Sequence, residues 1–182
     1  MRYSRRSMRN TDNLTRPSRA DMPRAETARD LLRHTIATVA YRGAKAVRGA
    51  PPKFATFKVS KSSRTPVEIL AHIGDLFDWA LALAQRSHEW HDSPPMAWDA
   101  EVKRFFATLK RFDDYLASDA PLKGSAEQLF QGPIADALTH VGQLTMLRRC
   151  VEVPIKGENY AKSEIVSGRV GAEQAQPRVE FD

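Results

Sequence analysis

A chain of 182 residues is long enough for one domain with a full core and too short for two ordinary ones. Its 42% hydrophobic and 27% charged residues are typical of a soluble globular protein, and no apolar run reaches the ~18 residues of a membrane span. Of the net charge of +6, residues 1–25 carry +5. A DNA-binding domain carries its basic excess on the fold itself, so we expect neither a nucleic-acid nor a membrane partner.

The first 24 residues show no hydrophobic periodicity and are rich in arginine and other polar residues. This composition predicts a disordered basic N-terminal arm. We expect residues 25–152 to form a helical domain. Residues 153–182, which are rich in glycine and charge, are expected to form an irregular C-terminal tail packed on it.

Four amphipathic helices are predicted in the central region. The first, residues 25–47, is ended by the prolines that follow Gly49, and the second starts with Thr65 as N-cap and Pro66 in its first turn. In the third, residues 99–117, apolar side chains recur every three or four residues, and the fourth, residues 134–150, follows Gly132-Pro133. Helices with one apolar face each are buried most economically in an all-α four-helix bundle.

The only cysteine, Cys150, rules out an intrachain disulfide and fits a reducing compartment, so we expect a cytoplasmic protein. It stands among apolar residues at the end of the fourth helix. We therefore expect a small core side chain there rather than a nucleophile, which would need a neighbouring histidine or cation.

Two of the predicted helices carry residues that bind metals in other proteins. His72 lies among apolar residues of the second helix, and Asp136 precedes His140 by one turn in the fourth. Imidazole nitrogen and carboxylate oxygen bind divalent metals such as Zn²⁺ and Ni²⁺, and bundles build such sites from facing helices. The spacing therefore makes His72, Asp136 and His140 candidate metal ligands.

The same spacing is also found in ordinary salt-linked pairs. Asp30 with His34, and Glu68 with His72, have it too, so the pattern alone leaves both interpretations open. The segment from His88 to His91 falls in a loop, and we expect it to be exposed surface.

Residues 65–81, in which His72 follows Leu70-Ala71, resemble the second helix of DinB-like proteins. Residues 136–149, with the stretch His140-Val-Gly-Gln143, resemble the last bundle helix of that family. With the four-helix layout, the resemblance covers about residues 25–152. It implies a four-helix bundle, often dimeric, in which three histidines bind a divalent metal, and some relatives are thiol-dependent transferases or isomerases.

Carried over to this chain, the resemblance assigns His72 and His140 as two of the three ligands. The third family histidine falls at Asp136. An aspartate can still bind zinc or nickel and makes a site more anionic, but it is equally compatible with a weak or lost metal. Gln143 is a candidate for positioning a ligand, or else an ordinary solvent-facing residue.

Two functions follow from these observations. One is an enzyme, a metal-dependent thiol transferase or hydrolase of a small molecule. The sequence does not identify its catalytic residues, since Glu68 and Asp75 are only neighbours of His72 on the same helix. The other is a non-catalytic, dimeric binding or stress-associated bundle with a vestigial metal site. Phe77 and Trp79 are candidates for an apolar face that would form a homodimer.

Overall fold

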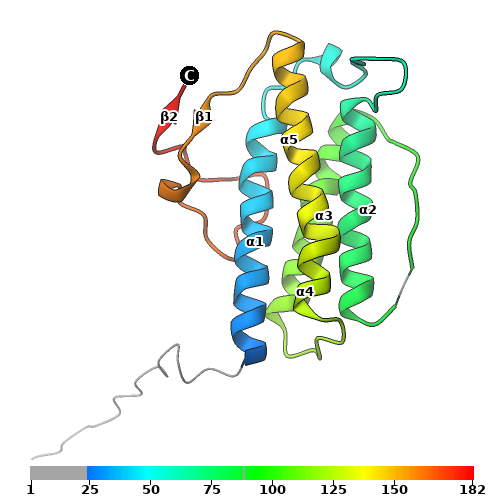
Figure 1. Ribbon diagram of the computed structural model, residues 1–182, viewed down its shortest axis with the longest axis vertical. Coiled ribbons are helices and arrows are strands. Elements are labelled where there is room, and N and C mark those ends of the chain that lie inside the picture. Colours follow the sequence, from blue (N-terminus) through cyan, green and yellow to red (C-terminus); the bar gives the residue numbers. More distant parts are fainter. Residues whose placement is uncertain (1–23, 88) are drawn as a thin grey trace, which may run out of the picture.

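The computed structural model describes residues 24–87 and 89–182, so the predicted N-terminal arm lies outside the described residues except for Arg24. Four helical columns stand side by side (Figure 1). They are α1 (Arg24–Val47), α2 (Pro66–Ala84), α3 (Trp98–Ala117) and a column formed by α4 (Ala126–Leu129) and α5 (Ala135–Cys150). The predicted mainly α bundle is confirmed.

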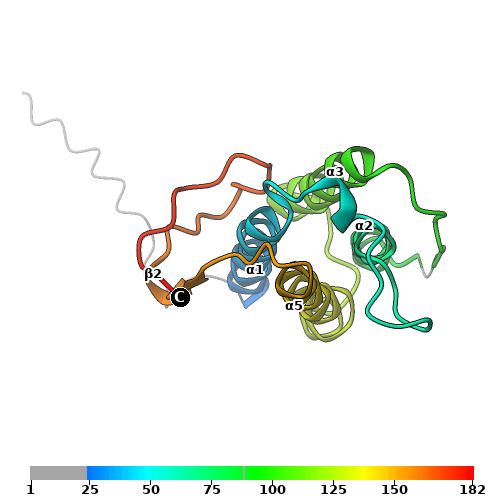
Figure 2. The same cartoon turned by 90° about the horizontal axis from the view of Figure 1, so that it is seen from above.

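Helices α1 and α2 each pack against both α3 and α5, so that α3 and α5 stand diagonally across the bundle (Figure 2). One continuous core fills the space between them. None of the described helices has the length and apolar character needed to cross a membrane. The largest side chains that are fully buried are Ile36, Phe54, Leu70, Ile73, Phe77, Phe105, Leu109, Phe112, Leu116, Leu129, Ile134 and Leu144.

The start of α2 is as predicted. Thr65 is its N-cap, and the Thr65 side chain accepts a hydrogen bond from the Glu68 amide at 3.3 Å. The Glu68 carboxylate accepts one in return from the Thr65 amide at 2.6 Å, which completes a capping box. The helix that carries His72 is therefore held at a defined first residue.

The last helix, α5, begins within one residue of the predicted start at residue 134, but the helical structure that precedes it was not predicted. The helical column begins at Ala126, where the Ser125 side chain accepts a hydrogen bond from the Gln128 amide at 3.1 Å. It then passes through a π-helical turn, Phe130–Ile134, that contains Pro133. Proline has no amide hydrogen to donate and its ring crowds the preceding turn of an α-helix, so the wider π turn lets the column continue where the sequence suggested a stop.

Two predictions about single side chains are wrong. Cys150 is exposed, because the buried face of α5 runs through Leu144 and Leu147 and Cys150 projects from another side. Phe77 is fully buried, because α2 is covered by both α3 and α5. Phe77 therefore cannot contribute to an exposed apolar face for a homodimer.

The C-terminal segment lies against α1. A two-residue strand β1 (Gly157–Glu158) pairs antiparallel with β2 (Glu180–Phe181), and a short 3-10 helix (Tyr160–Lys162) follows β1 (Figure 1). Between the strands, Val170 is 1% exposed and belongs to the main core.

A buried carboxylate, that of Glu158, fastens this segment to α1. It accepts hydrogen bonds from the Tyr41 hydroxyl at 2.6 Å, from the Lys45 ammonium at 2.8 Å and from the Ser163 hydroxyl at 2.6 Å. Burial raises the pKa of Glu158, but these three donors outweigh it and lower the pKa below its ordinary value. Glu158 therefore stabilises the fold as an anion.

We expect Glu158→Gln to lower the free energy of unfolding by about 2 kcal/mol at pH 7, because a buried charge-assisted network loses its acceptor. Since the folded-state pKa is depressed, this contribution is complete above the ordinary carboxyl pKa of about 4.3 and is lost as the pH falls through the folded-state value. Urea unfolding of the unchanged protein and of Glu158→Gln, at pH values from about 3 to about 7, measures the difference in their free energies of unfolding.

The matched control is Glu180→Gln, because Glu180 accepts a hydrogen bond from the same Lys45 at 2.7 Å but is partly exposed. Its cost should stay below about 1 kcal/mol, as for surface ion pairs. Equal costs for the two variants, or a Glu158 effect that grows towards acid pH, would contradict this account.

Candidate metal centre

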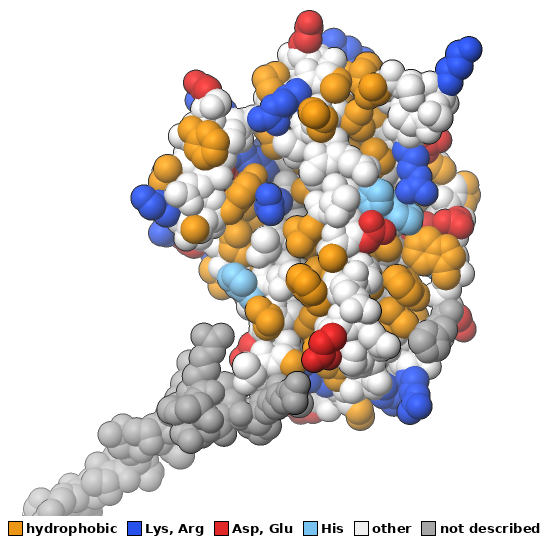
Figure 3. All heavy atoms as spheres, viewed as in Figure 1, with side chains coloured by type: hydrophobic (Ala, Val, Ile, Leu, Met, Phe, Trp, Pro, Cys, Tyr) orange, Lys and Arg blue, Asp and Glu red, His pale blue; other side chains and the backbone are white. Residues whose placement is uncertain are grey.

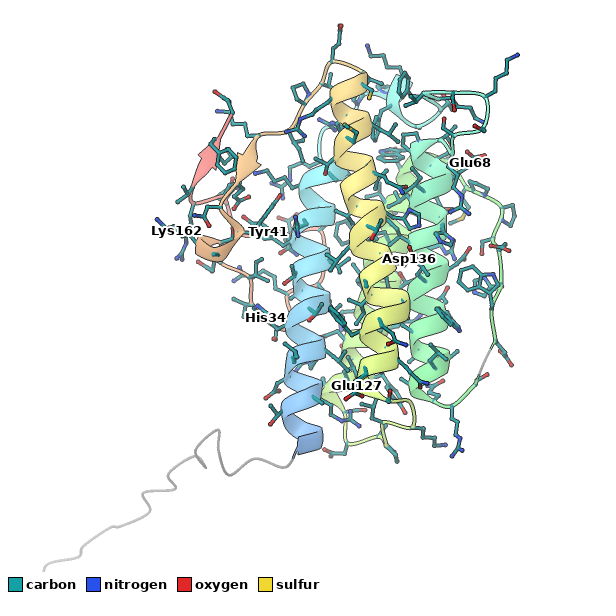
Figure 4. All side chains as sticks on the ribbon, in the orientation of Figure 1. His34, Tyr41, Glu68, Glu127, Asp136 and Lys162 are labelled. Carbon is teal, nitrogen blue, oxygen red and sulfur yellow. The ribbon has the colours of Figure 1, made fainter. Side chains whose placement is uncertain are left out.

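The three candidate ligands meet where α2 packs against α5. His72 Nε2 lies 3.5 Å from Asp136 Oδ2, and His140 Nε2 lies 3.4 Å from Asp136 Oδ1. The two imidazole rings are perpendicular, with centroids 4.8 Å apart. Asp136 projects from α5 towards α2 (Figure 4). The structure thus brings together all three residues that the sequence singled out, with their ligand atoms within 4.8 Å of one another.

The orientation of His140 is set by Gln143. His140 Nδ1 lies 2.8 Å from Gln143 Oε1, and because an amide oxygen only accepts, this contact places the ring hydrogen on Nδ1. The lone pair of Nε2 then faces Asp136. Metal-binding histidines commonly donate their second nitrogen to a carbonyl or carboxylate in this way. The predicted positioning role of Gln143 is thus consistent with the geometry, although the rest of its side chain is exposed.

The imidazole of His72 is disposed to be neutral. Burial lowers the pKa of His72 below its ordinary value, the neighbouring His140 imidazole and the Arg64 guanidinium lower it further, and Asp136 opposes them only in part. Only a neutral imidazole has a lone pair available for a metal. The environment of His72 therefore suits a ligand better than a charged partner of Asp136.

Aromatic rings surround His72 on its outer side. The loop after α2 returns along that helix, as Figure 1 shows, and the Trp90 ring stands edge-on to His72 with centroids 5.6 Å apart. Trp90 also contacts Trp79, at 5.9 Å between centroids. This part of the loop therefore covers one flank of the candidate site, a role that the sequence did not suggest.

A pocket of about 470 Å³ opens on the other flank of His140. Its wall is mainly apolar, and among the described residues that line it Arg64 is the one Lys or Arg side chain. Among the residues described, Arg64 has no salt-bridge or hydrogen-bond partner, since the nearby Glu68 is engaged in the capping box. The pocket is lined by Ser63, Arg64, Ile69, His140, Gln143, Met146 and Leu147.

A second group of possible ligands consists of Asp75, Asp78 and His91. His91 Nδ1 lies 3.2 Å from Asp75 Oδ1, and His91 Nε2 lies 3.7 Å from Asp78 Oδ2. The described residues of this loop segment, 89–91, are exposed as expected, and His91 in addition contacts α2; His88 lies outside the described residues.

Guanidinium groups already neutralise this second group. Arg104 pairs with Asp75 and lies 3.5 Å from Asp78, and Arg111 also pairs with Asp78. The Ser93 amide donates to Asp75 at 2.9 Å. Burial raises the pKa of Asp75, but the Ser93 and Arg104 hydrogen bonds outweigh it and lower the pKa. The arrangement is an ion-pair network that fastens the loop to α2 and α3, and a metal would have to displace arginines from it.

Of the three carboxylate–histidine pairs that stand one helical turn apart, Asp136 and His140 lie within salt-bridge distance, at 3.4 Å, whereas the other two are not linked among the described residues. The Glu68 carboxylate is hydrogen-bonded to Thr65 rather than to His72, and no salt bridge joins Asp30 to His34. The network of Asp75 and Asp78 was missed. The sequence feature that could have revealed it is the presence of two carboxylates, three residues apart, in a mainly apolar helix. Carboxylates in such a position need charged or hydrogen-bonding partners.

Comparisons of this protein with protein-family models, curated proteins and solved structures found no match. The fold and the site therefore define the class of protein: a mainly α bundle with a candidate His/Asp metal group.

We expect His72 in metal-free protein to titrate below its ordinary pKa of about 6.5. Asp136→Asn should lower the pKa further, because the Asp136 carboxylate is the group that favours the charged imidazole. Because the folded-state pKa is depressed, the contribution of His72 to stability is present above pH 6.5 or so and is lost as the pH falls. Histidine NMR titrations after chelator treatment measure the His72 pKa in the unchanged protein and in Asp136→Asn. A higher His72 pKa in the variant would contradict this role of Asp136.

Proposed function

We propose that His72, Asp136 and His140 hold a divalent metal ion, with zinc and nickel the leading candidates. The observation that carries this proposal is the convergence of two imidazoles and one carboxylate from different helices. In a tetrahedral site with bonds of 2.0–2.1 Å, neighbouring ligand atoms lie about 3.3 Å apart. The separations of 3.5 Å and 3.4 Å run to different oxygens of Asp136, and one donor atom from each of the three residues lies within 4.8 Å of the others, so a small closing movement would let one ion contact all three.

The chemistry of these donors supports the proposal. Two neutral nitrogens and one carboxylate oxygen form a set that catalytic zinc sites use, and three protein ligands leave a position for water or substrate. When bound, such an ion lowers the pKa of a coordinated water or thiol and so supplies a nucleophile at neutral pH. The His140–Gln143 hydrogen bond would keep one ligand oriented, and Trp90 would shield His72 from solvent.

On this basis the protein is a DinB-like, metal-dependent thiol transferase or hydrolase of a small molecule, acting as a homodimer. The site and the layout of the bundle support the likeness to that family. The pocket beside His140 is of a size suited to a small substrate, with Ile69, Met146 and Leu147 to contact its apolar part. Arg64 at the pocket would attract an anionic group of the substrate.

The other candidate is a non-catalytic, dimeric binding or stress-associated bundle with a vestigial site. One observation favours it: distances of 3.4 Å and 3.5 Å also describe ion pairs between Asp136 and protonated histidines. In that protein Asp136 would satisfy both rings directly, and no metal would be needed.

The two candidates differ in metal content. We expect protein purified without a histidine tag or chelator to contain about one divalent ion per chain, by elemental analysis, because the site offers three converging ligands. His72→Ala should abolish binding, and Asp136→Asn should reduce it to well below one ion per chain, while circular dichroism shows unchanged helicity. Protein that holds no metal, and takes none up on titration, would favour the salt-linked bundle.

Two histidine variants serve as controls. His34→Ala removes an exposed histidine of α1, which Figure 4 shows well apart from Asp136, and should leave the metal content unchanged. His91→Ala removes the histidine of the second acidic group and should also leave it unchanged. Loss of the ion in His91→Ala, with retention in His72→Ala, would move the metal site to Asp75 and Asp78.

A further inference from the structure

A second pocket lies on a different side of α5, where α1, α5 and the C-terminal segment meet, and it shares no lining residue with the pocket beside His140. Its volume is about 260 Å³. Lysine and arginine side chains gather with apolar ones on this face, between the strands and α5 (Figure 3). The lining residues are Arg42, Leu138, Val141, Gly142, Thr145, Arg149, Ile155, Lys156, Gly157, Glu158, Tyr160 and Phe181.

The pocket has an excess of positive charge. Three cations line it, Arg42, Arg149 and Lys156, against one carboxylate, that of Glu158. Glu158 is already the acceptor for Tyr41, Lys45 and Ser163 and is buried, so it does not neutralise the lining cations. Within the described parts of the chain, neither Arg149 nor Lys156 forms a salt bridge.

Arg42 is held in place by an aromatic ring. Its guanidinium carbon lies 4.3 Å from the centroid of the Tyr160 ring. Stacking uses the face of the guanidinium and leaves its edge donors free, an arrangement that suits recognition of phosphate. A fixed donor also loses less conformational entropy on binding than a free surface arginine does.

The remaining lining is apolar or open. Leu138, Val141, Ile155 and Phe181 contribute apolar side chains. A Cβ at Gly142 would meet no atom of the described residues within 4 Å, so they leave the backbone of α5 uncovered at this point. The pocket therefore combines a cationic region with room for a small hydrophobic group.

We propose that this pocket binds a small organic phosphate, with the phosphate on Arg42, Arg149 and Lys156 and an apolar or aromatic group against Val141, Ile155 and Phe181. A phosphate dianion matches three cations better than a carboxylate does, and its three oxygens accept several donors at once. The volume admits one compact molecule. Binding would join the C-terminal segment to α5, and it is independent of the proposed metal site.

Titration calorimetry of the full-length protein with phenyl phosphate and with inorganic phosphate tests the proposal. We expect phenyl phosphate to bind more tightly, because only it fills the apolar part of the pocket. Arg149→Gln should weaken its binding by about 10-fold, the effect of losing one charge-assisted hydrogen bond. The matched control is Lys103→Gln, which removes an exposed charge from α3, diagonally across the bundle, and should change nothing.

Two further variants separate this pocket from the metal site, which could itself bind phosphate. Gly142→Leu should block phenyl phosphate without changing any charge, because it fills the open space beside α5. Asp136→Asn should leave the affinity unchanged. The proposal is overturned if neither probe binds, if the two probes bind equally, or if binding is lost in Asp136→Asn and retained in Arg149→Gln.

Discussion

The contact between α2 and α5 is the constraint on which the candidate metal centre depends. Ile73 of α2 and Ala137 and Leu144 of α5 belong to one buried core and flank the three polar residues. Because a close-packed core fixes the distance between two helices, His72 and Asp136 have little freedom to separate. A site built from helices in this way is held more precisely than one built on loops.

Much of this arrangement could be predicted from the sequence. The sequence pattern predicted both ends of α1 and α3 and the start of α2 to within one residue, and the Thr65 cap was recognisable because its chemistry is local. His72, Asp136 and His140 could be grouped because Asp136 and His140 stand one helical turn apart and His72 lies among apolar residues of another predicted helix. Their meeting, however, depended on knowing that two particular helices are neighbours, for which the family resemblance was the guide.

What could not be predicted involves partners that are distant in the chain. Asp75 is paired with Arg104, and Glu158 with Lys45, across separations that no periodicity encodes. In each case a buried carboxylate fastens an irregular segment to the bundle, and the stability gained depends on several donors arriving together. The helical turns before Pro133 were missed for another reason. The rule that proline ends a helix assumes α-helical geometry, and here the chain avoids the steric clash by forming a wider π turn.

That widened turn also sets the angular relation between the two parts of the column. Each residue of an α-helix advances the chain by about 100°, and a π turn accommodates roughly one residue more than an α turn. Leu129, before the turn, is fully buried, and His140, after it, faces α2. In an uninterrupted α-helix with one residue fewer, only one of these orientations would be kept. The extra residue lets a single column meet two separate requirements, one for packing and one for ligand geometry.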